Sequence, residues 1–395
     1  MQSSNNITSK TVCVYPWIHV HAWADGKAFP CCMYDVNKPI GNIKNTGLNG
    51  TINSKSSKDI RHRMINDKKV AGCEKCYKLE ELGQPSMRVD GFKYYPEWQD
   101  YVAATNEDGS IDNFQLKYLD IRYSNLCNFA CVTCSPTFSS KWASDWEKLK
   151  QPLYHKANLK LDIWDELEPY LLNVKTVNFA GGEPLLMEDH WKIMNYWIDN
   201  GKTDQWINYT TNLSELTFKG QHIADLWAKF PNITLLISVD GAEQVGEWIR
   251  WGLEWEKLIA NIQLIQQRCP NIRIQITPTL SVYNVLDLFN AQRILHERAG
   301  IVPQQWQLNV LHYPPHLKAV NVPNSVKAQF VAAWNKHKEW LAANNLTDTM
   351  FDSVHQEIAA SGNYNDFGNA IDYARQLDSI RGTDSATLIP YLTNK

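Results

Sequence analysis

The strongest constraint on the fold is an alternation of short apolar runs with longer amphipathic runs, which extends over about 195 residues. The apolar runs, rich in β-branched residues, predict six strands: Leu116–Arg122, Val174–Ala180, Trp206–Thr211, Ile233–Val239, Ile272–Leu280 and Trp306–Leu311. The amphipathic runs predict helices, such as Asp189–Asn200, closed by Gly201, and Glu243–Gln267. Strands that alternate with helices pair in parallel, because a parallel return needs a crossover connection. Six units are fewer than the eight of a closed barrel, so we expect an α/β fold with an open (β/α)6 partial TIM barrel.

The remainder of the chain differs in composition from this alternating region. Residues 1–112 are rich in Cys, Gly, Lys and Asn, which predicts a small cysteine-rich domain with a linker near Thr105–Asp112. The barrel is expected over 113–320 and a helical C-terminal extension over 321–395. A length of 395 residues agrees with two or three domains.

Charge and hydropathy exclude several kinds of partner. The chain has 39 basic and 42 acidic side chains and a net charge of −3, so it produces no strong field for nucleic acid or anionic lipid. We find no apolar run long enough to span a bilayer, and the first residues, MQSSNNITSK, lack the apolar core of a signal peptide. We therefore expect a cytoplasmic protein with no nucleic-acid or membrane partner.

Cysteines are concentrated at one end of the chain. Eight of the nine lie within the first 134 residues, and the odd number argues against a disulfide framework. Clustered cysteines in a reducing compartment more often bind metal ions or iron–sulfur clusters. Cys269 stands alone before Pro270, and we interpret it as an inert buried thiol.

Three of these cysteines form the pattern Cys127-x3-Cys131-x2-Cys134, directly after the first predicted strand. Three thiolates on a tight loop can hold three corners of a cubane cluster and leave the fourth iron open to an exchangeable ligand. A zinc ion completed by a fourth ligand is the alternative.

This loop, SNLCNFACVTCSP, resembles that of radical S-adenosylmethionine (SAM) enzymes. The resemblance covers about residues 116–311, and further family elements follow the later strands in order. They are Gly181-Gly182-Glu183-Pro184, then Thr210-Thr211-Asn212, then Ser238-Val239-Asp240-Gly241, with Arg250 twelve residues past Ser238. A looser similarity includes DSIRGTDSATLIPYL near the C-terminus.

The resemblance implies a set of SAM contacts. Gly181, Gly182, Glu183 and Pro184 would lie near the methionine amino group, with Glu183 as an acceptor for the ammonium. Ser238 and Arg250 would contact the ribose and the methionine carboxylate, and Asn212 and Asp240 would complete the set. Thr133 stands where the family usually has an aromatic residue whose backbone meets adenine.

The positions of these elements support the resemblance independently. Each follows the carboxyl end of a predicted parallel strand, where barrel folds place their active sites. Taken alone, GGEP could be a turn that starts a helix, SVDG a strand-end turn and Arg250 a solvated helix residue. Asp120, His312 and Tyr313 also fall near this end, but no residue can be assigned as a general acid or base.

The N-terminal cysteines form a second pattern. Cys13-x12-Gly26-x4-Cys31, followed by Cys73-x2-Cys76, resembles the start of the SPASM and twitch auxiliary-cluster domains of radical SAM enzymes, which usually follow the barrel. We expect one fully ligated 4Fe–4S cluster on Cys13, Cys31, Cys73 and Cys76, with Cys32 as a substitute for Cys31. The absence of further cysteines favours the shorter twitch form, and a four-cysteine zinc staple is the alternative.

Two other segments carry simpler expectations. His19 and His21 alternate with Trp17 and Trp23 as in a strand and are expected to pack in the core. The basic run Lys55–Lys69 is expected to form a helix with a solvated face.

Together these features predict an oxidoreductase-type radical SAM enzyme with two 4Fe–4S clusters. It would cleave SAM reductively to a 5′-deoxyadenosyl radical, with electrons from a reductant such as flavodoxin or ferredoxin. The radical would abstract hydrogen from a substrate, for which we favour a peptide or protein undergoing modification. The alternatives are oxidation or rearrangement of a small molecule, and a non-catalytic iron–sulfur or zinc protein.

Overall fold

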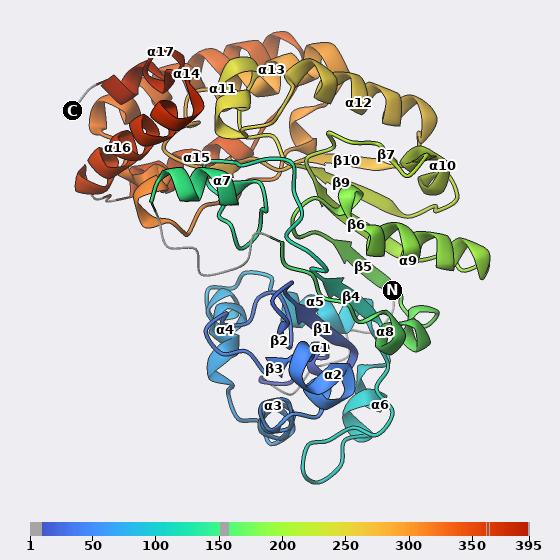
Figure 1. Cartoon of the computed structure of the whole chain (residues 1–395). Helices are drawn as coiled ribbons and strands as arrows, with labels where there is room; N and C mark the ends of the chain where they lie inside the picture. The colour runs from blue at the N-terminus through green and yellow to red at the C-terminus, as the bar shows by residue number, and fades with distance from the viewer. Residues whose placement is uncertain (1–9, 151–157, 361, 363, 394–395) are drawn as a thin grey trace. The chain divides into compact units, whose positions relative to one another are not determined.

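The computed structural model describes residues 10–150, 158–360, 362 and 364–393, and the chain divides into two units (Figure 1). The first unit comprises Met1–Ser124, Lys160–Gly181 and Glu188–Ile207, and the second comprises Asn125–Leu159, Gly182–Met187 and Asn208–Lys395. Most of the polar N-terminal segment, residues 1–9, lies outside the described residues.

The first unit consists of short helices and a mixed set of strands. Its elements are α1 (Tyr15–Ile18), β1 (His19–Ala22), β2 (Lys27–Phe29), β3 (Gly41–Asn42), α2 (Ile43–Ile52), α3 (Lys55–Ile65), η1 (Ala71–Cys73), α4 (Glu74–Glu81), α5 (Met87–Tyr94), α6 (Trp98–Ala103), β4 (Tyr118–Ile121), α8 (Trp164–Leu171), β5 (Thr176–Phe179) and α9 (Glu188–Asp199). The strand order is β3-β2-β1-β4-β5. β1 pairs antiparallel with β2 and parallel with β4, and β4 pairs parallel with β5.

β1 is a central strand of this unit, and all four of its residues are buried. In its register with β4, His19 lies opposite Tyr118 and His21 opposite Asp120. The expectation that the two histidines pack in the core is therefore confirmed. The basic run is helical as α3, with the exposed residues of a solvated face.

β6 (Trp206–Thr211) begins in the first unit and ends in the second. The other elements of the second unit are α7 (Trp142–Lys148), η2 (Pro184–Leu186), β7 (Thr217–Phe218), β8 (Gln221–His222), α10 (Ile223–Trp227), β9 (Ile233–Ile237), α11 (Glu243–Ile249), α12 (Trp255–Arg268), β10 (Arg273–Ile276), β11 (Thr279–Leu280), α13 (Leu288–Ala299), η3 (Pro303–Gln305), β12 (Asn309–Val310), η4 (Pro315–Leu317), η5 (Ala319–Asn321), α14 (Asn324–Ala343), α15 (Met350–Ala359), α16 (Tyr364–Arg381), α17 (Ser385–Leu388) and η6 (Pro390–Thr393).

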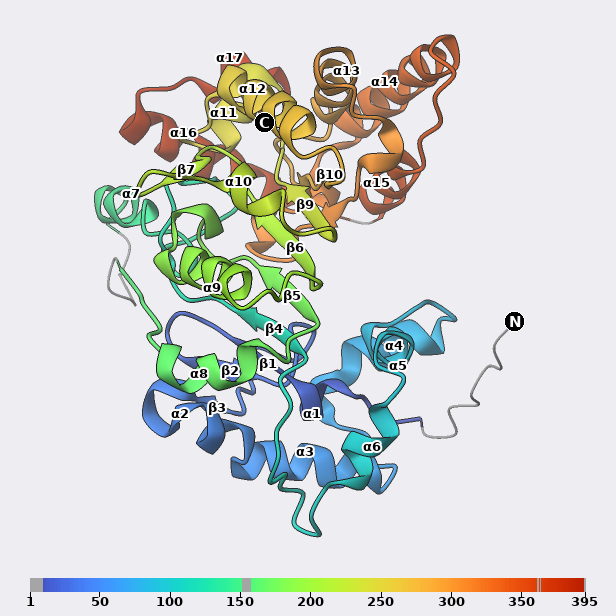
Figure 2. The ribbon, with the colours of Figure 1, turned by 90° about the vertical axis from the view of Figure 1, so that its right-hand side faces the viewer.

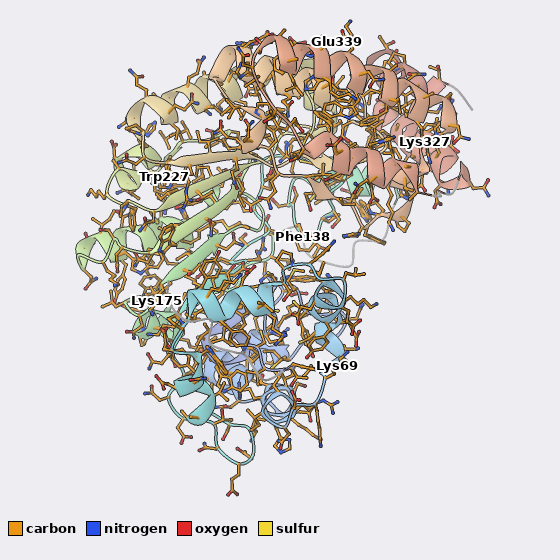
Figure 3. The ribbon with its side chains drawn as sticks, turned by 180° about the vertical axis from the view of Figure 1, so that it is seen from behind. Lys69, Phe138, Lys175, Trp227, Lys327 and Glu339 are labelled. Carbon is orange, nitrogen blue, oxygen red and sulfur yellow. The ribbon has the colours of Figure 1, made fainter. Side chains whose placement is uncertain are left out.

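Apart from the short antiparallel pair β7–β8, the strands of the second unit pair in parallel, and helices cover them. β9 pairs with β10 and β11 with β12, and Ile276 forms a parallel bridge with Trp306. α12, α13 and α14 pack in succession (Figure 2). Trp227 of α10, labelled in Figure 3, is buried and packs edge-on against Tyr209 of β6.

A strand occurs within each of the six predicted ranges, and the C-terminal region is helical. The fifth range contains two short strands, because Pro278 between β10 and β11 has no N–H to donate to a neighbour. The expected α/β fold with parallel strands and a helical C-terminus is confirmed, and the parallel pairing is consistent with an open partial barrel. No helix in the described ranges is both long and apolar enough to cross a membrane.

The prediction of one helix over Glu243–Gln267 is wrong, because the structure has two helices, α11 and α12. Gly252 between them has a φ of +111°, a conformation that other residues rarely adopt. The carbonyls of Ile249 and Trp251 accept hydrogen bonds from Val132 and Ala130, at 2.8 Å each. The break therefore supplies backbone partners to the cysteine loop, a requirement that helical periodicity cannot reveal.

Candidate functional site

The three-cysteine loop, residues 127–134, follows β4 and is held through its backbone. Besides the amides that bond the α11–α12 break, several of its carbonyls accept hydrogen bonds from side chains. Ser139 Oγ donates to the Phe129 carbonyl at 2.5 Å, and Trp142 Nε1 donates to the Cys131 carbonyl at 2.9 Å. A loop without regular structure thus has its polar backbone paired.

The thiols of this loop are free, and they interact with one another. Cys131 is buried, and Cys127 and Cys134 are half-buried. Burial, and then the neighbouring Cys131, raises the pKa of Cys127 to about 12. Burial raises the pKa of Cys134 as well, and Cys131 and Cys127 add to that increase. The three sulfurs therefore lie within electrostatic range of each other, and a metal centre would displace their protons.

Two glycines let the next loop approach the cysteines closely. Gly181 has a φ of +132°, in a region that favours glycine. A Cβ on Gly182 would lie 2.0 Å from the carbonyl oxygen of Leu126, the residue before Cys127. The amide of Glu183 donates to that same carbonyl at 2.7 Å. Pro184 then begins η2, as its fixed φ favours.

Glu183 joins this loop to the end of β6. Its Oε1 accepts from Thr211 Oγ1 at 2.6 Å and from the Leu185 amide at 3.2 Å, and its Oε2 accepts from the Asn212 amide at 2.7 Å. Burial raises the pKa of Glu183, although these hydrogen bonds oppose the shift. Both carboxylate oxygens of Glu183 therefore already accept hydrogen bonds from other residues of the chain.

The Asn212 side chain continues the connection to the cysteine loop. Its Nδ2 donates to Asn128 Oδ1 at 3.0 Å, and its Oδ1 accepts from the amide and hydroxyl of Ser214. Because Asn128 follows Cys127, this amide pair fixes the loop beside its first cysteine.

Arg250 lies near the thiols, and part of its guanidinium has no hydrogen-bond partner among the described residues. Asp240 Oδ2 accepts from Arg250 Nη1 at 2.8 Å, and Asp240 Oδ1 accepts from the Thr279 amide at 2.6 Å. Arg250 Nε is buried and has no hydrogen-bond partner within the described ranges. Its charge lowers the pKa values of Cys127 and Cys131, against the larger effect of burial. The arginine is thus oriented by one carboxylate and retains a donor for another.

The remaining sequence-predicted residues differ in their surroundings. Ser238 follows β9, and no hydrogen bond of its hydroxyl is found among the residues described. Thr133 is half-buried within the cysteine loop. His312 and Tyr313 are exposed, Tyr313 at 78%, and within the described chain neither side chain hydrogen-bonds to that loop.

The N-terminal cysteines form a second group, in the first unit. Cys13 and Cys76 are buried, and Cys31 and Cys73 are half-buried. Burial raises the pKa of each thiol, and Cys73 interacts electrostatically with Cys31 and Cys76, as Cys13 does with Cys73 and Cys76.

Cys32 has a different environment. Its thiol is exposed and donates to Met87 Sδ at 3.8 Å. Gly26, the glycine of the pattern, has a φ of +92°, and a Cβ there would lie 2.3 Å from Asn42 Oδ1. The pattern therefore needs glycine for the turn that returns β2 alongside β1.

Asp120 lies at the centre of a buried polar cluster in the first unit. It accepts from His21 Nδ1 at 3.0 Å and from Asn178 Nδ2 at 3.3 Å, and Arg122 Nε lies 3.5 Å away. Trp23 Nε1 donates to His21 Nε2, which makes Nδ1 the donating nitrogen. Burial opposes ionisation, but Arg122 and His21 lower the pKa of Asp120. The carboxylate is thus ionised and paired.

No sequence pattern pointed to Trp142 or Ser139, and Arg381 was marked only as part of the DSIRG tail. Arg381 Nη2 donates to the Ala130 carbonyl at 2.8 Å, over a separation of 251 residues. Its motif neighbour Asp378 accepts from Trp248 Nε1 at 2.8 Å. The tail therefore anchors α16 to the region of the cysteine loop.

A cavity of about 690 Å³ borders this loop. Its lining includes Asn128, Lys141, Trp251 and Glu254, and none of the predicted SAM contacts is among the residues that line it.

Comparison with known families matches two parts of the chain. Residues 121–287 match the Radical SAM superfamily, and residues 13–77 match the SPASM iron–sulfur cluster-binding domain. A curated protein of Selenomonas ruminantium, "S-adenosylmethionine-dependent nucleotide dehydratase", is 28% identical over 179 residues, which are 42% of this chain and 57% of that protein. The chain thus matches little more than half the length of that relative.

The solved structures that are similar to this chain match it with low TM-scores. Streptococcus suis SuiB bound to precursor peptide SuiA has a TM-score of 0.38 and 14% identity, over 74% of this chain and 64% of that chain. Native anSMEcpe with bound AdoMet has a TM-score of 0.36 and 16% identity, over 51% and 53%. Scores at this level support no assignment of function.

The family matches coincide with the two cysteine groups. The first spans the cysteine loop, Glu183 and Arg250, and the second spans Cys13 to Cys76. The resemblance inferred from the sequence is confirmed: the chain carries a radical SAM domain and, N-terminal to it, an iron–sulfur cluster-binding domain of the SPASM type.

Proposed function

We propose that this protein is an enzyme that holds a 4Fe–4S cluster on Cys127, Cys131 and Cys134, binds SAM at it, and abstracts a hydrogen atom from a substrate. When bound, the cluster and SAM supply a one-electron cleavage that yields methionine and a 5′-deoxyadenosyl radical. The observation that carries the proposal is Arg250, whose buried Nε has no hydrogen-bond partner among the described residues and whose charge acts on the thiols of the loop.

The donor set fits an iron–sulfur cluster. Three thiols on one loop, and four in the N-terminal set, match the cysteine ligation of iron–sulfur clusters.

Each predicted contact has a role that its surroundings support. Arg250 Nε would bind the methionine carboxylate, with Asp240 fixing the guanidinium. The Ser238 hydroxyl would bind the ribose. Glu183 would fix the loop that contacts the amino group, because its own oxygens already accept three hydrogen bonds.

The other contacts would act through the backbone. Gly181, Gly182 and Pro184 bring the loop close to the cysteines, and Thr133 would offer its backbone to adenine. Asn212 would act by holding Asn128.

In the N-terminal domain we propose a second 4Fe–4S cluster on Cys13, Cys31, Cys73 and Cys76. The mutual interactions of Cys31 with Cys13 and Cys73 support Cys31 as the fourth ligand. The exposed thiol of Cys32 is then the spare one. A reducing compartment such as the cytoplasm, with flavodoxin or ferredoxin as electron donor, suits nine free thiols.

For the substrate we propose a peptide or protein, which the resemblance to SPASM and twitch enzymes favours. A small molecule is the second candidate, because the curated relative is named as a nucleotide dehydratase. Deuterated peptides and deuterated nucleotides distinguish the two by which one transfers label to 5′-deoxyadenosine.

The test is an anaerobic SAM-cleavage assay on the reconstituted protein. The wild type should release 5′-deoxyadenosine on reduction. Arg250→Lys should bind SAM about 10-fold or more weakly, because the charge-assisted contact of Nε, worth roughly 1.5–3 kcal/mol, is lost. An iron-loaded wild type that binds SAM but releases no 5′-deoxyadenosine would contradict the proposal.

A further inference from the structure

A buried arginine from the C-terminal extension contacts the three-cysteine loop. The Arg381 side chain is 1% exposed. Its Nη2 donates to the carbonyl of Ala130, the residue before Cys131, at 2.8 Å, and its Nε donates to Asp145 Oδ2 at 2.9 Å.

Aromatic rings shield this arginine from water. Its Cζ lies 5.0 Å from the Trp142 ring centroid and 5.3 Å from that of Trp251. Arg381 ends α16, which packs against α7, the helix that carries Trp142 and Asp145 (Figure 1). The match to the family model ends at residue 287, before Arg381.

The N-terminal domain contains an equivalent arrangement. Arg88 Nη1 donates to the carbonyl of Val12, the residue before Cys13, at 2.8 Å, and its Nε donates to Glu80 Oε1 at 2.9 Å. The side chain is 7% exposed.

A purely structural tether would not require these features. A buried ion pair is often no more stabilising than apolar side chains of the same size. Here each buried guanidinium instead bonds the carbonyl directly before a cysteine, which places its charge beside a ligand-bearing segment. The same combination occurs in two cysteine sites that belong to different domains.

We propose that Arg381 and Arg88 are positioning residues, one for each cysteine site, which hold a ligand-bearing loop and stabilise the reduced form of its cluster. The inference rests on the proposed clusters at Cys127, Cys131 and Cys134 and at the N-terminal cysteines. Reduction adds one electron and so one negative charge to a cluster, and a desolvated positive charge nearby favours that state. Each arginine therefore raises the midpoint potential of its own cluster.

The test measures midpoint potentials by EPR-monitored redox titration of the reconstituted full-length protein. The EPR signal that changes on adding SAM identifies the three-cysteine cluster. Arg381→Met should shift that midpoint to a more negative value and leave the other unchanged, and Arg88→Met should do the reverse. Arg375→Met is the matched control, because Arg375 lies on the same helix but is exposed and pairs with Asp372.

Asp145→Asn tests the sign of the effect. It removes the counter-charge and leaves Arg381, so the midpoint of the SAM-responsive cluster should become more positive. Damage to the loop would not move the potential in opposite directions in Arg381→Met and Asp145→Asn. If Arg381→Met fails to fold, Arg381→Lys and Asp145→Asn decide in the same way, with the lysine variant shifted negative by less.

The outcomes separate this inference from the proposed function. Clusters that assemble and respond to SAM, with midpoints equal to those of the wild type in all variants, overturn the inference alone. A wild type in which SAM changes no signal, and whose iron content is unaltered by Cys127→Ala, overturns the proposed function.

Discussion

At the candidate site, the atoms around a residue explain which amino acid stands there. The sequence pattern identified the GGEP element, and the structure shows why its second glycine tolerates no side chain, since the Leu126 carbonyl occupies that space. Arg381, Trp142 and Ser139 carried no comparable signal. Each donates a hydrogen bond to a backbone carbonyl of the cysteine loop. No sequence pattern records these contacts, because only folding brings donor and acceptor together.

Gly182→Ala tests this close approach. The new methyl group would lie 2.0 Å from the Leu126 carbonyl oxygen, so the cysteine loop must move, at a cost of about 1–3 kcal/mol. We expect reduced iron and sulfide content after anaerobic reconstitution and a lower Tm. Gly368→Ala is the control, because it lies in α16 with nothing within 4 Å and should fold at least as stably. Equal iron content in the two variants would contradict the argument.

At the scale of elements, the strands were more predictable than the helix boundaries. Buried strands are marked by local runs of apolar residues, and all six ranges contain one. The break between α11 and α12 was missed because its cause is a partner segment, the cysteine loop, about 120 residues away. The pairing of β1 with β4 likewise links segments about 100 residues apart and has no local signal.

The packing of α13 against α14 contains a titratable group. His337 is fully buried; its Nδ1 accepts from Arg293 Nε at 3.2 Å and its Nε2 donates to Gln292 Oε1 at 2.7 Å. Burial, together with Arg293, lowers the pKa of His337 from 6.5 to about 4. The unfolded chain therefore binds a proton between these values when the folded chain does not.

Stability should consequently fall as pH decreases from 6.5 towards 4, by about 2–3 kcal/mol from this group. Asp348, which bonds Gln292, has a pKa raised by burial and contributes a smaller change of opposite sign. Urea unfolding at several pH values should show a shallower dependence in His337→Gln than in the wild type. His62→Gln, at an exposed site, should retain the wild-type slope, and equal slopes for all three proteins would refute the assignment.

For the molecule as a whole, the two cysteine groups belong to different units. The loop with Cys127, Cys131 and Cys134 lies in the second unit, together with Glu183, Ser238, Asp240 and Arg250. The four N-terminal cysteines lie in the first. Each group has its own buried environment and its own arginine, so each should assemble its metal centre separately.

Metal analysis tests this separation. The reconstituted wild type should contain about eight iron atoms per chain, against about four with one zinc if the N-terminal site is a zinc staple. Cys73→Ala combined with Cys76→Ala should reduce iron to about four and keep the SAM-responsive EPR signal. Cys269→Ala is the control, because this buried thiol bonds the Ala224 carbonyl, away from both cysteine groups in the sequence, and its loss should leave iron unchanged. Loss of all iron in the double variant would show that the sites depend on each other.

The sequence by itself determined the α/β class, the six strand positions and the two cysteine groups, because apolar periodicity and ligand spacing are local properties of a chain. Only the tertiary structure decided which polar atoms of the site have hydrogen-bond partners among the described residues. Glu183 and Asp240 have both carboxylate oxygens occupied, whereas Arg250 retains a buried N–H. Hydrogen-bond capacity at a buried site depends on partners contributed by distant segments, and no spacing in the sequence records those contacts.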